Sequence, residues 1–165
     1  MNDFMKQLSS YNLLNCLLPG VVFVELGAQI LELTVPRDNL LVAAFMYYFV
    51  GLLVSRAGSL ILEPFLKGVG FVVFADHFDF VKASKVDSKI DVLTETNNTY
   101  RTMAACVLLL LVLEFWQWFV GQVPVVARAG VPMMSVAVAM LLLFSYRKQT
   151  NYIRNRVEAN EEVPK

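Results

Sequence analysis

The sequence of 165 residues has a single histidine and two cysteines, and only 17% of its residues are charged. One histidine leaves almost no material for nucleophile–base catalysis, and two cysteines do not make a metal-binding framework. No serine elbow, glycine-rich phosphate loop or Cys-x-x-Cys pair is present. The net charge is zero, so bulk charge gives no reason to expect a nucleic-acid partner. We therefore expect no enzyme, no cofactor and no metal site.

Apolar residues are abundant instead, and they are concentrated in long runs. They make up 57% of the chain, and residues 102–122 contain one charged side chain while residues 129–145 contain none. A bilayer core about 30 Å thick requires roughly 20 residues of helix, and in hydrocarbon a span must satisfy its own backbone hydrogen bonds. The sequence therefore predicts an all-α polytopic membrane protein, one membrane domain over 1–165. Its four expected spans are 11–33, 39–62, 102–123 and 129–146, and Pro64 is expected to end the second.

The basic residues predict the orientation of these spans. Only Arg37 and Arg128 fall in the two short loops on one side. Eleven fall on the other: Lys6, Lys67, Lys82, Lys85, Lys89, Arg101, Arg147, Lys148, Arg154, Arg156 and Lys165. Basic residues accumulate on the cytoplasmic side of membrane proteins. We therefore expect both termini, the loop 64–101 and the tail 147–165 to be cytoplasmic.

The first span carries a polar stripe at helical spacing. Its members are Tyr11, Asn15, Leu18, Val22, Glu25, Gln29 and Glu32, separated alternately by four and three residues. An ionised side chain at the bilayer centre costs roughly 2.5–3.5 kcal/mol, so the stripe must face protein or water. Three interpretations remain open: packing inside the bundle, a water-filled path in an oligomer with acidic rings that favour cations, and a small-ligand or proton-coupled site.

An intramembrane trio is the candidate site within these spans. Counted from the cytoplasmic side, Glu25 and Glu114 lie at nearly the same depth, and Arg56 lies about 9 Å nearer the cytoplasm. Two carboxylates at one depth without a cation should not both be ionised. The trio is therefore expected to be functional, or else to be a salt bridge that fixes the register of the helices.

The second span has small residues on one face. Gly51, Ser55 and Ser59 recur every four residues, which allows neighbouring helices to approach closely. We expect them to pack helices together, either within one subunit or between subunits.

The cytoplasmic loop is expected to contain a helix from about residue 77 to 94, capped by Asp76. Lys82, Lys85 and Lys89 fall on one arc of it among apolar residues. Such a face suits either an anionic membrane surface or a neighbouring protein.

Three segments together resemble a known group of proteins. NLLNCLLPGVVF, SRAGSLILEPFL and TNNTYRT, in this order around a basic loop, resemble small four-span bacterial inner-membrane proteins, several of which accompany anti-phage defence systems. The resemblance implies a membrane effector or sensor that works with a cytoplasmic partner and alters membrane integrity. We therefore expect an oligomeric inner-membrane effector or ion-channel subunit. The alternative is a non-conducting scaffold that anchors a cytoplasmic protein through the loop 64–101.

Overall fold

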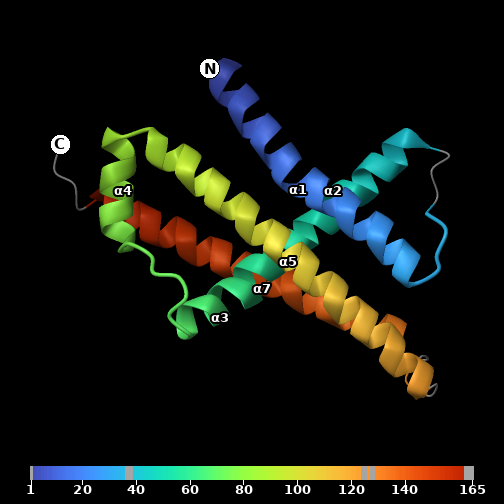
Figure 1. Ribbon diagram of the computed structural model, residues 1–165. Coiled ribbons are helices and arrows are strands. Elements are labelled where there is room, and N and C mark those ends of the chain that lie inside the picture. Colours follow the sequence, from blue (N-terminus) through green and yellow to red (C-terminus); the bar gives the residue numbers. More distant parts are fainter. Residues whose placement is uncertain (1, 36–38, 124–125, 127–128, 162–165) are drawn as a thin grey trace.

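The computed structural model describes residues 2–35, 39–123, 126 and 129–161, with the side chains of 15–35, 39–76, 78–123, 126 and 129–158 (Figure 1). Within these ranges every regular element is a helix. In chain order they are α1 (Asn2–Ile30), α2 (Leu40–Ala57), the π-helix η1 (Gly58–Leu62), α3 (Glu63–Gly68), α4 (His77–Val86), α5 (Lys89–Gln122) and α7 (Gly130–Glu161). The prediction of an all-α chain is confirmed.

Three helical stretches among the described residues are long and apolar enough to cross a membrane: Leu40–Gly68, Lys89–Gln122 and Gly130–Glu158. They correspond to the second, third and fourth predicted spans. The apolar part of α1 with described side chains, Asn15–Ile30, is shorter. The chain is therefore a multi-pass membrane protein by composition and length, and the fourth span remains a prediction.

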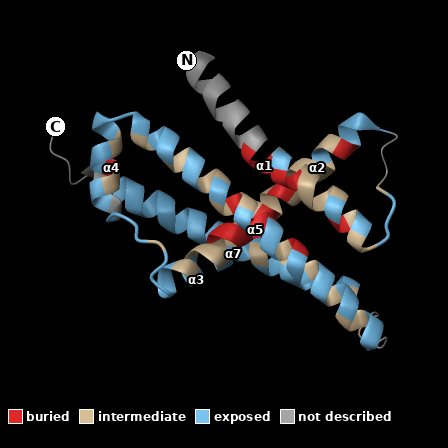
Figure 2. Cartoon of the chain, in the orientation of Figure 1, coloured by how far each residue is buried: buried red, intermediate tan, exposed pale blue. Residues whose placement is uncertain are grey.

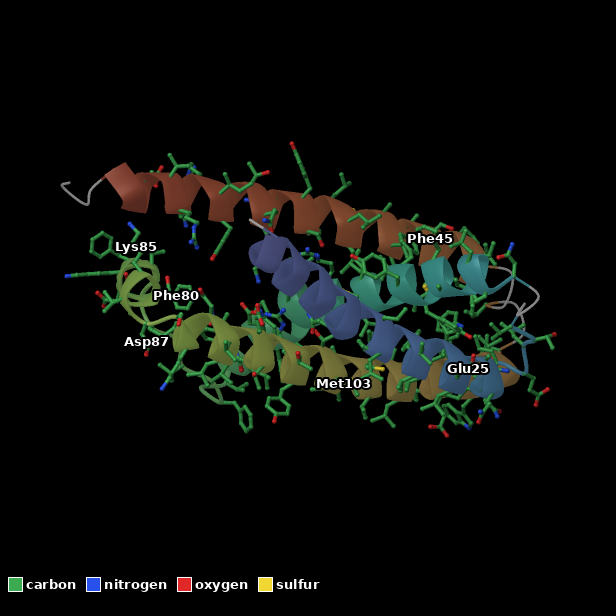
Figure 3. All side chains as sticks on the ribbon, turned by 90° about the horizontal axis from the view of Figure 1, so that it is seen from above. Glu25, Phe45, Phe80, Lys85, Asp87 and Met103 are labelled. Carbon is green, nitrogen blue, oxygen red and sulfur yellow. The ribbon has the colours of Figure 1, made fainter. Side chains whose placement is uncertain are left out.

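The helices pack around α2. In Figures 1 and 3, α2 lies between α5 and α7, and α1 crosses α2 while it runs beside α5. Buried residues gather where α1, α2 and α5 meet (Figure 2). The core there consists of Val54, Ala105, Cys106 and Leu110. The outward faces are apolar as well, with Phe115 and Trp118 of α5 63% and 60% exposed, as expected for surfaces that lipid covers.

The crossing of α1 and α2 depends on two glycines. A Cβ atom added at Gly51 would lie 1.7 Å from the carbonyl oxygen of Cys16, and one added at Gly20 would lie 1.8 Å from that of Tyr47. No side chain fits at such distances, so the two backbones touch directly. Close contact of this kind is how small residues associate helices in lipid.

The small residues of the second span each meet a different helix. Gly51 contacts α1, and Ser55 Oγ accepts a hydrogen bond from Thr102 Oγ1 of α5 at 3.3 Å. Ser59 is buried and accepts hydrogen bonds from Lys148 of α7. These residues therefore pack helices of one chain.

The first predicted span ends earlier than expected. The helix stops at Ile30, and Glu32 adopts a left-handed conformation with φ 54°. Leu33 N donates to Ala28 O at 2.9 Å and Glu32 N donates to Gln29 O at 3.4 Å, a pair of bonds that terminates helices in the Schellman motif. The predicted boundary at residue 33 is therefore wrong, because the backbone reverses its twist at Glu32.

Pro64 does not end the second span. The helix continues from η1 through Glu63–Gly68. In η1 the backbone is wound one residue wider, and Glu63 N–H donates to Gly58 O, five residues back. A widened turn ahead of a proline re-arranges the bonds that the missing N–H would otherwise break, so the expected stop becomes a continuous helix.

The predicted loop helix is two helices. α4 is capped as expected, because Asp76 Oδ1 accepts from Phe78 N at 2.8 Å. It ends at Val86, however, and α5 starts at Lys89 after Asp87 Oδ1 has accepted from Lys89 N at 2.9 Å. The chain bends at Asp87 because its side chain bonds a backbone donor ahead of it, which competes with helix formation.

Candidate functional site

Glu25 faces α2. It is half-buried, and its Oε1 accepts a hydrogen bond of 2.5 Å from Tyr47 Oη. Figure 3 shows Glu25 near the C-terminal end of α1. A short hydrogen bond between a phenol and a carboxyl group is a strong one. It fixes α1 against α2 on the side of the Gly20–Gly51 crossing that is nearer the C-terminal end of α1. Glu25 therefore has a structural partner that the sequence pattern did not reveal.

Arg56 belongs to a different level of α2. It lies nine residues beyond Tyr47, which is about 13 Å along a helix axis. Glu25 is bonded to Tyr47, so Glu25 and Arg56 of the expected trio lie at different levels of α2. The depth argument placed Glu25 and Arg56 closer because it counted residues from the predicted span ends and left out the tilt between crossing helices.

Gln29 and Glu114, in contrast, are brought together. Both side chains are exposed and line one open hollow of about 410 Å³ between α1 and α5. The rest of its wall is apolar: Leu26, Ile30, Val107, Leu110 and Leu111. Glu114 lies eight residues before the end of α5, in a stretch that has no other charged residue between 102 and 122. We call it the Gln29–Glu114 hollow, because these two residues are the polar members of an otherwise apolar wall.

The polar stripe of α1 does not lie on one neighbour. Asn15 is buried, Leu18 is 53% exposed, Glu25 faces Tyr47, and Gln29 lines the hollow. Glu32 is exposed and follows the helix end, so it no longer shares the helical face. The spacing predicts that the seven residues of the stripe share one face of α1. Because α1 crosses its neighbours at an angle, the described members of this face meet different helices or lie exposed.

A second polar site lies at the other end of α2. Glu63 Oε2 accepts from Arg101 Nη1 at 2.6 Å, and Glu63 Oε1 lies 3.2 Å from Lys148 Nζ and 3.8 Å from Lys67 Nζ. The Glu63 side chain is 13% exposed and that of Arg101 is 19% exposed. We call Glu63, Lys67, Arg101 and Lys148 the Glu63 cluster. It joins α3, α5 and α7, and its cations outnumber its carboxylate by three to one.

The widened turn of η1 helps to build this cluster. Because Glu63 N–H bonds to Gly58 O and residue 64 is a proline, the Ser59 carbonyl loses its usual backbone donor. Lys148 Nζ supplies the replacement, at 2.8 Å from Ser59 O and 2.7 Å from Ser59 Oγ. The ammonium of Lys148 therefore supplies the donor that the Ser59 carbonyl lacks in the π-turn, and this contact joins α7 to η1.

The sequence analysis assigned the members of the Glu63 cluster separately. The sequence predicts a span end at Pro64, and it places Lys67 and Arg101 in the loop 64–101 and Lys148 in the tail 147–165. Their common signal is position: each lies next to the boundary of an apolar run, at 62, 102 or 146. A comparison of levels at the span ends would have grouped them.

The loop lysines lie apart from both sites. Lys82 and Lys85 are exposed on α4, and Lys89 is the first residue of α5 rather than part of the same helix. α4 lies across the ends of α5 and α7, as Figure 3 shows, and its Val81 is 2% exposed. The three lysines are exposed on two helices. The break between α4 and α5 at Asp87 separates Lys89 from Lys82 and Lys85, so the three do not form the single helical face that was predicted.

Among the described residues, no group of three or more His, Cys, Asp or Glu side chains could hold a metal ion. Comparison with known proteins gives no match to a family model, a curated protein or a solved structure. The resemblance to four-span proteins of anti-phage systems therefore remains a prediction. The described residues show a helical, multi-pass membrane-type protein with an open hollow lined by Gln29 and Glu114 and with an ionic cluster around Glu63.

Proposed function

We propose that the chain is a subunit of an oligomeric, channel-like membrane effector, in which copies meet over the Gln29–Glu114 hollow and enclose a polar path. The observation that carries this proposal is the exposure of Glu114 in the middle of an otherwise uncharged apolar run. Lipid is a poor environment for it, because a charged group at the bilayer centre costs roughly 2.5–3.5 kcal/mol. Another copy, or water enclosed by several copies, provides a better one.

The packing of the single chain favours a path between copies over a path through one chain. At the centre of the described bundle, Thr102 and Cys106 are fully buried, and α1, α2 and α5 are in direct contact. The Gln29–Glu114 hollow is open and shares Leu110 with the core. Symmetric copies around an axis would each contribute one Glu114, and a ring of carboxylates attracts cations and repels anions. Gln29 adds a neutral amide that can replace part of the hydration shell of an ion.

The remaining parts of the proposal come from the sequence. The distribution of basic residues favours cytoplasmic termini and a cytoplasmic α4. The resemblance to anti-phage proteins suggests that the membrane is a bacterial inner membrane, and that a cytoplasmic partner triggers the path and thereby alters membrane integrity.

A non-conducting scaffold is the second candidate. It is favoured by α4, which lies across α5 and α7 with Lys82 and Lys85 exposed on its surface. In that case the chain recruits a cytoplasmic protein, and the hollow is closed by a neighbouring helix without conducting ions.

Ion flux through liposomes that contain the purified chain distinguishes the two candidates. We expect cation flux in the wild type, and a loss of cation selectivity in Glu114→Gln, which keeps the shape of the side chain and removes its charge. The matched control is Asp91→Asn, which removes an exposed carboxylate from the first turn of the same helix. Flux that equals that of empty liposomes, or selectivity that survives Glu114→Gln, contradicts the channel. Loss of partner recruitment in Lys82→Gln with Lys85→Gln, without any flux, supports the scaffold.

A further inference from the structure

The Glu63 cluster has more positive charge than its own carboxylate can neutralise. Lys67, Arg101 and Lys148 surround one glutamate, which leaves a formal excess of two positive charges. The Nε atom of Arg101 is buried and has no hydrogen-bond acceptor among the described residues. Buried or half-buried cations are stable when anions balance them, so the cluster is electrostatically incomplete.

The cluster also lies at a particular level of the bundle. Glu63 follows the apolar run of α2 and η1, Arg101 immediately precedes the run 102–122, and Lys148 follows the run 129–145. Direct contacts among these side chains show that the three boundaries coincide in space. In a membrane, the end of the hydrocarbon is the level at which lipid phosphates lie.

We propose that the Glu63 cluster binds a phosphate group, and that this group belongs to the headgroup of an anionic lipid in the adjoining leaflet. Basic pockets between transmembrane helices bind such headgroups through charge and hydrogen bonds. The proposal does not depend on ion conduction and stands even if the chain is a scaffold.

Individual side chains have different roles in this site. Lys67 is 47% exposed, and its ammonium lies 3.8 Å from Glu63 Oε1 and 4.0 Å from the centroid of the Phe74 ring. It makes no hydrogen bond shorter than these contacts among the described residues, so an incoming phosphate can bind it. Lys148 is 44% exposed but already donates to Ser59 and Glu63, so it contributes charge rather than a new bond. Arg101 is bonded to Glu63 and is 19% exposed, so it contributes its charge without direct contact with the phosphate. Glu63 opposes binding, because it neutralises part of the charge that attracts the anion.

Native mass spectrometry of the detergent-solubilised full chain, titrated with phosphatidylglycerol, tests the proposal. Each basic residue near an anionic headgroup contributes about five-fold to affinity, so Lys67→Gln with Lys148→Gln should weaken binding roughly 30-fold. The matched control is Arg154→Gln with Arg156→Gln, which makes the same change of charge on the exposed part of α7 and should leave binding near the wild-type value. Lys67→Gln alone removes only the longest of the Glu63 contacts, at 3.8 Å. It should weaken binding about five-fold, and it keeps the test valid if the double variant fails to fold.

Glu63→Gln distinguishes a lipid-binding site from a purely structural cluster, because only a lipid-binding site should bind the lipid more tightly in this variant. Removing the opposing charge should tighten phosphatidylglycerol binding about five-fold, although the same change breaks three ion pairs. Phosphatidylcholine and inorganic phosphate are the comparison ligands. Binding of inorganic phosphate without lipid, lost in the same variants, supports a phosphate site and assigns it to a soluble ligand. Equal binding of phosphatidylcholine and phosphatidylglycerol, or equal lipid binding by the cluster and control variants, overturns the proposal.

Discussion

Replacing Gly51 with alanine should separate α1 from α2. The added Cβ would lie 1.7 Å from the Cys16 carbonyl oxygen, whereas real Cβ contacts are essentially never shorter than 3.0 Å. One helix must therefore move by about 1.3 Å, and the obstacle is backbone rather than a flexible side chain. Over-packing of a close contact costs typically 1–3 kcal/mol, so we expect a loss of about 3 kcal/mol, at the upper end of that range.

The two cysteines report this displacement. Cys16 and Cys106 are 8% and 0% exposed, and both lie at the junction of α1 with its neighbours. In Gly51→Ala we expect a lower unfolding temperature in detergent, measured by circular dichroism, together with faster maleimide labelling of these thiols. Gly121→Ala is the control, because an added Cβ there meets nothing within 4 Å. As a better helix former, alanine should leave the stability unchanged or raise it by at most about 1 kcal/mol.

The reasoning is refuted if Gly51→Ala and Gly121→Ala behave alike in both measurements. Such a result would mean that α1 and α2 cross at a greater separation, with room for side chains between them. The Tyr47–Glu25 hydrogen bond would then also need a different explanation, because it depends on the same close crossing.

Two further predictions concern α1. Tyr47→Phe should destabilise the chain by about 1.5–3 kcal/mol in chemical unfolding, because it removes a hydrogen bond to a carboxyl group, while ion flux stays unchanged. Tyr48→Phe alters the neighbouring phenol and should have little effect; an equal loss in both variants would contradict the role assigned to Glu25. Glu32→Gly should stabilise the chain by about 1 kcal/mol, since glycine adopts φ 54° without steric cost. Glu32→Ala removes the charge but keeps the Cβ, so a matching gain in that variant would trace the effect to charge and not to the backbone.

The apolar helices were predictable from local properties. The runs at 39–62, 102–123 and 129–146 lie within helices of the structure except for their end residues 39, 123 and 129, and the Asp76 cap lies where it was expected. The boundaries were less predictable. The reversal at Glu32 and the widened turn before Pro64 depend on hydrogen bonds whose pattern cannot be read from residue types alone.

The candidate site was predictable in kind but not in membership. Glu114 is predicted from its depth, which matches that of Glu25, and in the structure it lines one hollow with Gln29. Glu25 accepts a hydrogen bond from Tyr47. This partner is not predictable from the sequence, because Tyr47 comes close to α1 only where the two helices cross. Arg56 is assigned to this site by counting residues from the predicted span ends, which assumes that the spans are parallel. In helices that cross, equal residue counts do not give equal depths.

The amino-acid sequence by itself determined that this chain is helical and suited to a membrane. That conclusion needs only the length and polarity of each run, compared with a bilayer of fixed thickness and without water to satisfy the backbone. The tertiary structure alone decided which polar groups come together: Glu25 bonds to Tyr47, Gln29 and Glu114 line one hollow, and Glu63 pairs with Arg101 and Lys148. These pairings join residues 22 to 85 positions apart, and they follow from the angle at which Gly20 and Gly51 allow two helices to cross and from the turn that Pro64 requires.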